Sequence, residues 1–115
     1  MNLILLKAPS VQFRWKDRKD NFHAPVQMET RHLFMTLVLI WNHTMPEDAF
    51  IDSSGRWTHH RYNLGPHYTV DYLSEAIGAL AQELAKRDDM EPAWRTTLRK
   101  MEFYLFKSHQ VRLLP

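Results

Sequence analysis

The segment from Leu33 to Trp41 constrains the fold of this chain more than any other feature. Thr36 is the one polar residue within it. A helix that is apolar nearly all round is stable only when other elements cover most of its surface. The segment is also far shorter than the ~20 residues that cross a bilayer. We therefore expect it to be the central helix of a globular core, running from about Pro25, which suits a first helical turn, to His43.

Two further stretches have the periodicity of amphipathic helices. One begins near Thr69, a plausible N-cap, and the other begins at Pro92. Residues three or four apart lie on one face of a helix. The connection Asp88-Asp89-Met90 is short, so we predict that these two helices form an antiparallel pair. The predicted core stripes are Leu73, Ile77, Leu80 and Leu84 in one helix, and Trp94, Leu98, Met101 and Leu105 in the other.

The remaining segments predict a small amount of β-structure. The alternation of Val11, Phe13 and Trp15 with polar residues is typical of a half-buried strand, and the apolar run 3–6 predicts another. The polar run 16–21 predicts a solvated loop. A turn at Ser53-Ser54-Gly55 predicts a small hairpin around residues 49–60. The predicted fold class is α+β and predominantly helical, with three main helices, an N-terminal strand pair and a single domain over residues 1–115.

Composition excludes several classes of protein. The chain has no cysteine, which rules out a disulfide scaffold, a thiolate nucleophile and any zinc site that uses cysteine. The short apolar run near Met1 follows no basic residues, so we do not expect a signal peptide. We expect a cytoplasmic protein with no membrane contact. A net charge of +2 is also not that of a strongly cationic nucleic-acid binder.

No catalytic motif is recognisable. Imidazoles are common metal ligands, and His59, His60 and His67 lie in or near predicted loops. However, no H-E-x-x-H pattern accompanies them, no serine has a G-x-S-x-G setting, and the glycines are too scattered for a phosphate loop. We predict no catalytic residues, no cofactor and no metal, and we place a metal-dependent hydrolase as a distant third reading.

Two segments far apart in sequence mix cations with aromatic rings. Arg and aromatic residues dominate hot spots in protein interfaces, while rings that stack on bases beside cations suit single-stranded nucleic acid. The structural alternative is that Trp15 and Trp57 anchor the core and the charges are solvated. A basic face on the last helix is a second candidate. The predicted partner-binding residues are Arg14, Lys16, Arg56, Trp57, Arg61 and Tyr62, and the second face consists of Arg95, Arg99 and Lys100.

A resemblance adds a biological setting. The stretch Met28-Glu29-Thr30-Arg31-His32-Leu33-Phe34, followed by Trp41-Asn42-His43-Thr44-Met45-Pro46, resembles small uncharacterised proteins of proteobacterial phages and integrative or mobile elements. The resemblance covers residues 28–115. It implies an accessory protein that binds a host protein, with some such proteins blunting host defence systems such as CRISPR. It carries over no functional residue.

These observations predict a non-enzymatic interaction protein of phage or mobile-element type that binds a macromolecular partner. An inhibitor of a host defence system, similar to an anti-CRISPR protein, is its most specific form. The expected partner is a host or complex protein. The alternative is a small nucleic-acid-binding module.

Overall fold

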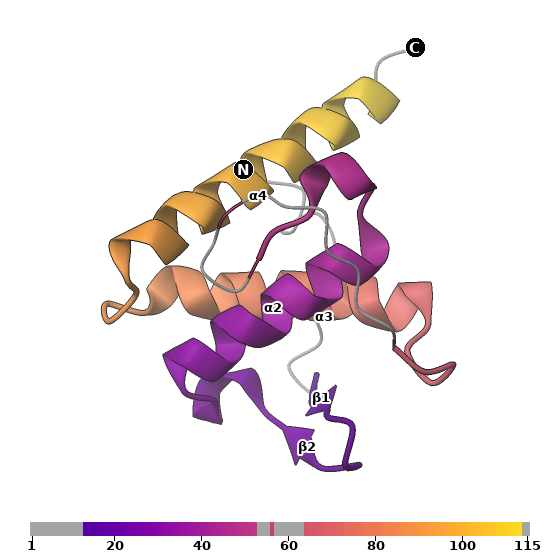
Figure 1. Cartoon of the computed structure of the whole chain (residues 1–115), viewed down its shortest axis with the longest axis vertical. Helices are drawn as coiled ribbons and strands as arrows, with labels where there is room; N and C mark the ends of the chain where they lie inside the picture. The colour runs from indigo at the N-terminus through magenta and orange to yellow at the C-terminus, as the bar shows by residue number, and fades with distance from the viewer. Residues whose placement is uncertain (1–12, 53–55, 57–63, 114–115) are drawn as a thin grey trace.

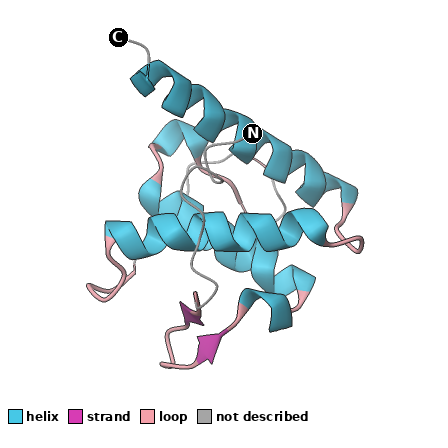
Figure 2. Cartoon of the chain, turned by 180° about the vertical axis from the view of Figure 1, so that it is seen from behind, coloured by secondary structure: helices cyan, strands magenta, loops and turns pink. Residues whose placement is uncertain are grey.

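The structure is a computed structural model, and it describes residues 13–52, 56 and 64–113, with the side chains of Glu47 and of 106–113 excepted. Most of the described chain is helical, and a small antiparallel sheet lies near its N-terminal end (Figure 1; Figure 2). The predicted fold class is therefore confirmed. The elements are β1 (Trp15–Lys16), β2 (Phe22–His23), the 3₁₀ helix η1 (Pro25–Gln27), α2 (Thr30–Thr44), the 3₁₀ helix η2 (Glu47–Ala49), α3 (Val70–Lys86) and α4 (Pro92–Leu113).

Helix α2 is the centre of the core, as its apolar sequence predicts. Leu33, Leu37 and Ile40 are fully buried within it. The helix lies across α3, and this is the most extensive helix–helix contact in the described chain (Figure 1). Two aromatic pairs join α2 to α4: Phe34 stacks on Trp94 at 4.8 Å between ring centroids, and Trp41 meets Tyr104 edge to face at 5.8 Å.

The pairing of the last two helices differs in detail from the prediction. After the short connection α4 turns back, but it diverges from α3 along its length (Figures 1 and 2). The reason is that the aromatic side chains of α4 pack on α2. Both helices begin where the sequence predicts. The Thr69 hydroxyl caps α3 by accepting a hydrogen bond from the Tyr72 amide at 3.2 Å.

The predicted start of the central helix near Pro25 is wrong. Residues Pro25–Gln27 form a separate 3₁₀ turn, Met28 and Glu29 are extended, and α2 begins at Thr30. Met28 and Glu29, with ψ of 144° and 150°, leave the helical region, so the turn at Pro25 cannot continue into α2. A side chain from far away in the sequence holds this turn: the Arg87 guanidinium donates to the carbonyls of Pro25 and Val26, at 3.2 and 3.4 Å.

The N-terminal strand pairing also differs from the prediction. Strand β1 pairs with β2, a segment that the sequence analysis left without a structure. The polar run between them forms the tight turn of this hairpin, and its residues 18–21 are exposed, in agreement with the predicted solvated loop. The predicted strand at 3–6 lies outside the described residues.

A buried amide on α2 holds the segment after η2. Asn42 is completely buried, accepts a hydrogen bond from the Ile51 amide at 2.7 Å and donates to the carbonyl of the same residue. The indole of Trp41 donates to the Ala49 carbonyl at 2.7 Å. Ala49 is the last residue of the 3₁₀ helix η2, so it does not lie in the arm of a hairpin as predicted. Most of the predicted hairpin at 49–60 lies outside the described residues, although the Asp52 amide does donate to the Arg56 carbonyl.

The burial of α2 generates a stability prediction. Leu37→Ala should lower the free energy of unfolding by about 2–5 kcal/mol, because it leaves a cavity at a fully buried position. Urea denaturation followed by circular dichroism measures this change. Val70→Ala, at a position that is 74% exposed, is the control and should change it by less than about 0.5 kcal/mol. Equal midpoints for the two variants would contradict the central position of α2.

Candidate partner-binding site

Asp17 fixes the turn of the β1–β2 hairpin. One of its carboxylate oxygens accepts hydrogen bonds from the amides of Lys19 and Asn21, at 2.8 and 2.9 Å. The other lies 2.8 Å from Nε2 of His23. These bonds, above all the one to His23, lower the pKa of Asp17 from its ordinary 3.8 to about 2. The turn includes Asp20 at φ 67°, in the left-handed region that Asp tolerates better than most residues.

Two tyrosines attach the hairpin to the helical body: Tyr68 in the loop before α3, and Tyr72 in the first turn of α3. The Tyr72 hydroxyl accepts a hydrogen bond from the Lys16 amide at 2.8 Å and donates to the Arg14 carbonyl at 2.9 Å. The Tyr68 hydroxyl donates to the Lys16 carbonyl at 3.0 Å. Desolvation raises the pKa of both phenols, so they stay protonated and keep donating. The two hydroxyls thus satisfy one amide and two carbonyl groups in the backbone of residues 14–16.

The rings of these tyrosines pack against the buried side of β1. Trp15 is buried and stacks on Tyr72 at 5.7 Å, and it lies 5.4 Å from the ring of Tyr68. For Trp15, the alternative reading, in which Trp15 and Trp57 anchor the core, is therefore confirmed, and Trp57 lies outside the described residues. Arg14 and Lys16 alternate with the buried rings: Arg14 is exposed, and Lys16 is half-buried and paired with Asp20 at 3.2 Å.

The other predicted partner-binding residues are only partly described. The Arg56 side chain is 81% exposed and lies 3.4 Å from the Asp52 carboxylate. Trp57, Arg61 and Tyr62 lie outside the described residues. Whether the two basic–aromatic segments form one surface therefore stays a prediction.

Two adjoining hollows lie between the hairpin, α2 and the loop before α3. The first, of about 240 Å³, is lined mainly by apolar side chains, with Arg18 and His32 among the polar ones. The second, of about 300 Å³, is lined by Lys16, Arg18, His67 and Tyr68 among others. Arg18 and Tyr68 line both hollows, which therefore adjoin, and we call the pair the hairpin groove. It is defined by Trp15, Lys16, Asp17, Arg18, Asp20, His32, Met35, Thr36, Leu39, Leu64, Gly65, His67 and Tyr68.

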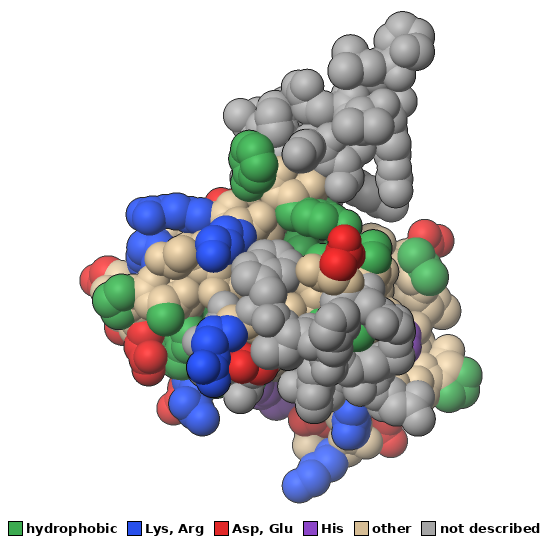
Figure 3. Space-filling view, turned by 45° about the horizontal axis from the view of Figure 1, so that its top comes forward, with side chains coloured by type: hydrophobic (Ala, Val, Ile, Leu, Met, Phe, Trp, Pro, Cys, Tyr) green, Lys and Arg blue, Asp and Glu red, His purple; other side chains and the backbone are tan. Residues whose placement is uncertain are grey.

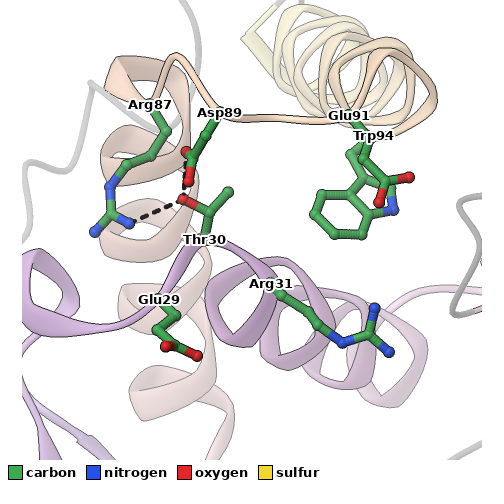
Figure 4. A pocket seen from close by; sticks show the side chains of 7 residues that line it. All are labelled: Glu29, Thr30, Arg31, Arg87, Asp89, Glu91 and Trp94. Atoms are coloured by element: carbon green, nitrogen blue, oxygen red, sulfur yellow. Dashed lines mark hydrogen bonds between the residues drawn. The ribbon is translucent and has the colours of Figure 1, made fainter.

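A larger hollow, of about 440 Å³, lies where the start of α2 meets the α3–α4 connection (Figure 4). Its central contacts serve the fold. Thr30 donates to an Asp89 oxygen at 2.6 Å and accepts from Arg87 at 3.1 Å. Arg87 also binds Glu83 at 3.0 Å, so its guanidinium ties η1, α2 and α3 together. This corner is a structural joint whose remaining lining carries charges of both signs.

The second predicted face lies on the first turns of α4. Arg95 is half-buried and donates to the carbonyl of Arg87 at 2.5 Å, so it holds the α3–α4 connection. Arg99 and Lys100 are exposed. On the side shown in Figure 3, the Lys and Arg side chains of the described residues form separate groups with Asp and Glu near them.

Within the described ranges, no group of three or more His, Cys, Asp and Glu residues could hold a metal ion. His59 and His60 lie outside these ranges, so the prediction of no metal stays a prediction. Among the described helices, none is both long and apolar enough to span a membrane.

Comparisons with known proteins found no relative. No protein-family model matches the chain, and searches of the curated proteins and of the solved structures gave no match.

Sequence reasoning missed the residues that position this site. Tyr68 and Tyr72 are four residues apart at a predicted helix start, a spacing that places side chains on one side. Asp17 lies in the polar run 16–21, and Asp is typical of turns in which the side chain accepts hydrogen bonds from nearby backbone amides. The tyrosine spacing does not identify the strand that Tyr68 and Tyr72 hold, because that contact spans more than fifty residues.

The hairpin turn generates a pH prediction. In a carbon-13 NMR titration, the Asp17 carboxylate should titrate near 2. Because the pKa is lowered by folding, the contribution of Asp17 to stability is complete above the ordinary 3.8 and is lost as the pH falls through about 2. His23→Ala should raise the pKa of Asp17 toward 3.8, and the control His67→Ala should leave it unchanged. A wild-type value near 3.8 would contradict the described turn.

The joint in Figure 4 generates a second stability prediction. Arg87→Lys should lower the free energy of unfolding by ~1.5–3 kcal/mol, because an ammonium cannot reproduce the fork of bonds to Glu83, Thr30 and Pro25. Thermal and urea unfolding measure the loss. Lys86→Ala is the matched control, since that side chain is 74% exposed and its nitrogen lies 4.0 Å from Glu83. A stability loss no larger than that of the control would show that the joint is dispensable.

Proposed function

We propose that this protein is a non-enzymatic interaction protein that binds an acidic surface of a partner protein through the hairpin and the start of α3. The observation that carries the proposal is the use of two tyrosine hydroxyls to hold the backbone of β1. These bonds fix the backbone that carries Arg14 and Lys16 beside the half-buried rings of Tyr68 and Tyr72. Fixing such groups before binding reduces the entropy that association costs.

Two features favour a protein over a nucleic acid as the partner. Base stacking needs open aromatic faces, whereas Trp15, Tyr68 and Tyr72 pack on one another. A phosphate backbone also needs a continuous basic track, and the Lys and Arg side chains in Figure 3 are interspersed with acidic ones. Nucleic-acid binding remains the alternative that the experiment tests.

The resemblance to proteins of phages and mobile elements narrows the proposal. We propose that the partner is a host protein in the bacterial cytoplasm, and that inhibition of a host defence system is the specific role. A small protein without catalytic groups can inhibit by covering a functional surface of its target.

The proposal predicts the outcome of an affinity capture. The wild-type chain is incubated with nuclease-treated bacterial lysate, beside Arg14→Glu with Arg18→Glu. Arg99→Glu with Lys100→Glu is the matched control, because it reverses two exposed cations on α4 and changes the net charge equally. Binding of the captured protein should weaken at least about tenfold, roughly 1.4 kcal/mol, for the hairpin variant alone.

Two outcomes would contradict the proposal. Equal losses for both double variants, with an affinity that falls steeply and linearly in log salt, would indicate nucleic acid or general charge attraction. Full retention by the hairpin variant would place the binding surface elsewhere.

A further inference from the structure

The β1–β2 hairpin is a small unit at the outer edge of the molecule (Figures 1 and 2). Its turn is held from within, since the Asp17 amide donates to the Asn21 carbonyl at 2.9 Å and the Asp17 carboxylate binds His23. Each strand has only two residues, and an isolated two-stranded hairpin is marginally stable at best in water. The hairpin therefore depends on its attachment to the helical body to stay folded.

The attachment is concentrated at the Tyr68 and Tyr72 side chains. Their hydroxyls make three hydrogen bonds to the backbone of residues 14–16, two through Tyr72 and one through Tyr68. Both rings pack on Trp15, and the ring of Tyr72 also lies 5.6 Å from that of Phe13. One small region of the body therefore provides both the polar and the apolar contacts to β1.

The end of the hairpin joins a segment that is held independently. Ala24 is extended, with φ −78° and ψ 130°, and it links β2 to the 3₁₀ turn η1. The Arg87 guanidinium binds the carbonyls of Pro25 and Val26 in that turn. A movement of the hairpin about Ala24 therefore leaves η1 and α2 in place.

The buried side chains indicate how much this movement costs. Within residues 13–23, the buried side chains are those of Phe13 and Trp15, whereas the remainder of the core belongs largely to α2, α3 and α4. His23 adds an edge-to-face contact with His32 at 5.3 Å. Openings that expose few buried apolar side chains cost less free energy than global unfolding. Detachment of the hairpin therefore costs less than unfolding of the helical body.

We infer that the hairpin is a lid that opens and closes as one unit about Ala24 while the helical body stays folded, and that the hydroxyls of Tyr68 and Tyr72 are its latch. The closed form holds Arg14 and Lys16 beside the tyrosine rings. The open form uncovers the rings and takes these two cations away from the body. This equilibrium concerns the free protein, so it does not depend on the proposed function.

Amide hydrogen exchange of the full-length chain, followed residue by residue by NMR, tests the lid. The informative pair is Lys16, whose amide is bonded to the Tyr72 hydroxyl, and Asp17, whose amide is bonded inside the hairpin. In the wild type both amides should share one opening free energy, below that of the Leu37 amide in α2. Low urea concentrations should affect the hairpin amides less than the α2 amides, because urea sensitivity scales with the surface exposed.

Tyr72→Phe removes the latch hydroxyl and keeps the ring that stacks on Trp15. It should accelerate exchange at Asp17 as well as at Lys16, by at least about tenfold, because the closed form loses two hydrogen bonds. Tyr68→Phe should have a smaller effect, since it removes one bond. The amides of α2 should exchange at the wild-type rate in both variants.

A matched control separates the latch from a general loss of a tyrosine hydroxyl. Tyr104→Phe makes the same change at another half-buried tyrosine, whose ring packs on Trp41, and it should leave the hairpin rates unchanged. Acceleration at Lys16 without acceleration at Asp17 would show a local loss of one bond and would overturn the inference. Equal acceleration in the hairpin and in α2 would also overturn it, because the hairpin would then open only when the whole chain unfolds.

Discussion

The need to cover helix α2 on nearly all sides organises the rest of this molecule. Exposing its apolar side chains to water would cost free energy, so the other described elements pack on α2 or on a neighbour of it. Helix α3 crosses it, α4 meets it through stacked and edge-to-face aromatic pairs, and the segment at Ile51 is bonded to its Asn42. The outer faces of these covering elements form much of the surface that is exposed to solvent and to other molecules.

Polar side chains attach the pieces that lack regular structure. Short strands and 3₁₀ turns leave backbone groups that need partners from elsewhere. Tyr68 and Tyr72 supply them for β1, Asn42 supplies them for Ile51, and Arg87 supplies them for η1. Tyr72 and Asn42 lie on helices, and Tyr68 and Arg87 flank α3. The bonds of the tyrosines and of Arg87 each span more than fifty residues. Rigidity outside the helices therefore depends on a few side chains rather than on a larger sheet.

The hairpin groove is a product of that arrangement. Its two cations come from the hairpin, and its apolar side chains come from β1, α2 and the loop before α3. Asp17 and Asp20 of the hairpin balance the two cations. No single segment contains the site.

The sequence by itself determined the helical class, the central helix and the starts of α3 and α4. These follow from local chemistry: the apolar run at Leu33–Trp41, the cap at Thr69 and the proline at Pro92. It also determined that Trp15 and Arg14 would face opposite ways, because side chains alternate along a strand. The tertiary structure alone decided that α2 begins at Thr30, that β1 pairs with β2, and that Met35 and Leu39 line a groove. Arg87, Tyr68 and Tyr72 bind the first two of these segments from more than fifty residues away, and the lining at Met35 and Leu39 depends on the hairpin that packs beside α2. No local pattern encodes which distant segment arrives.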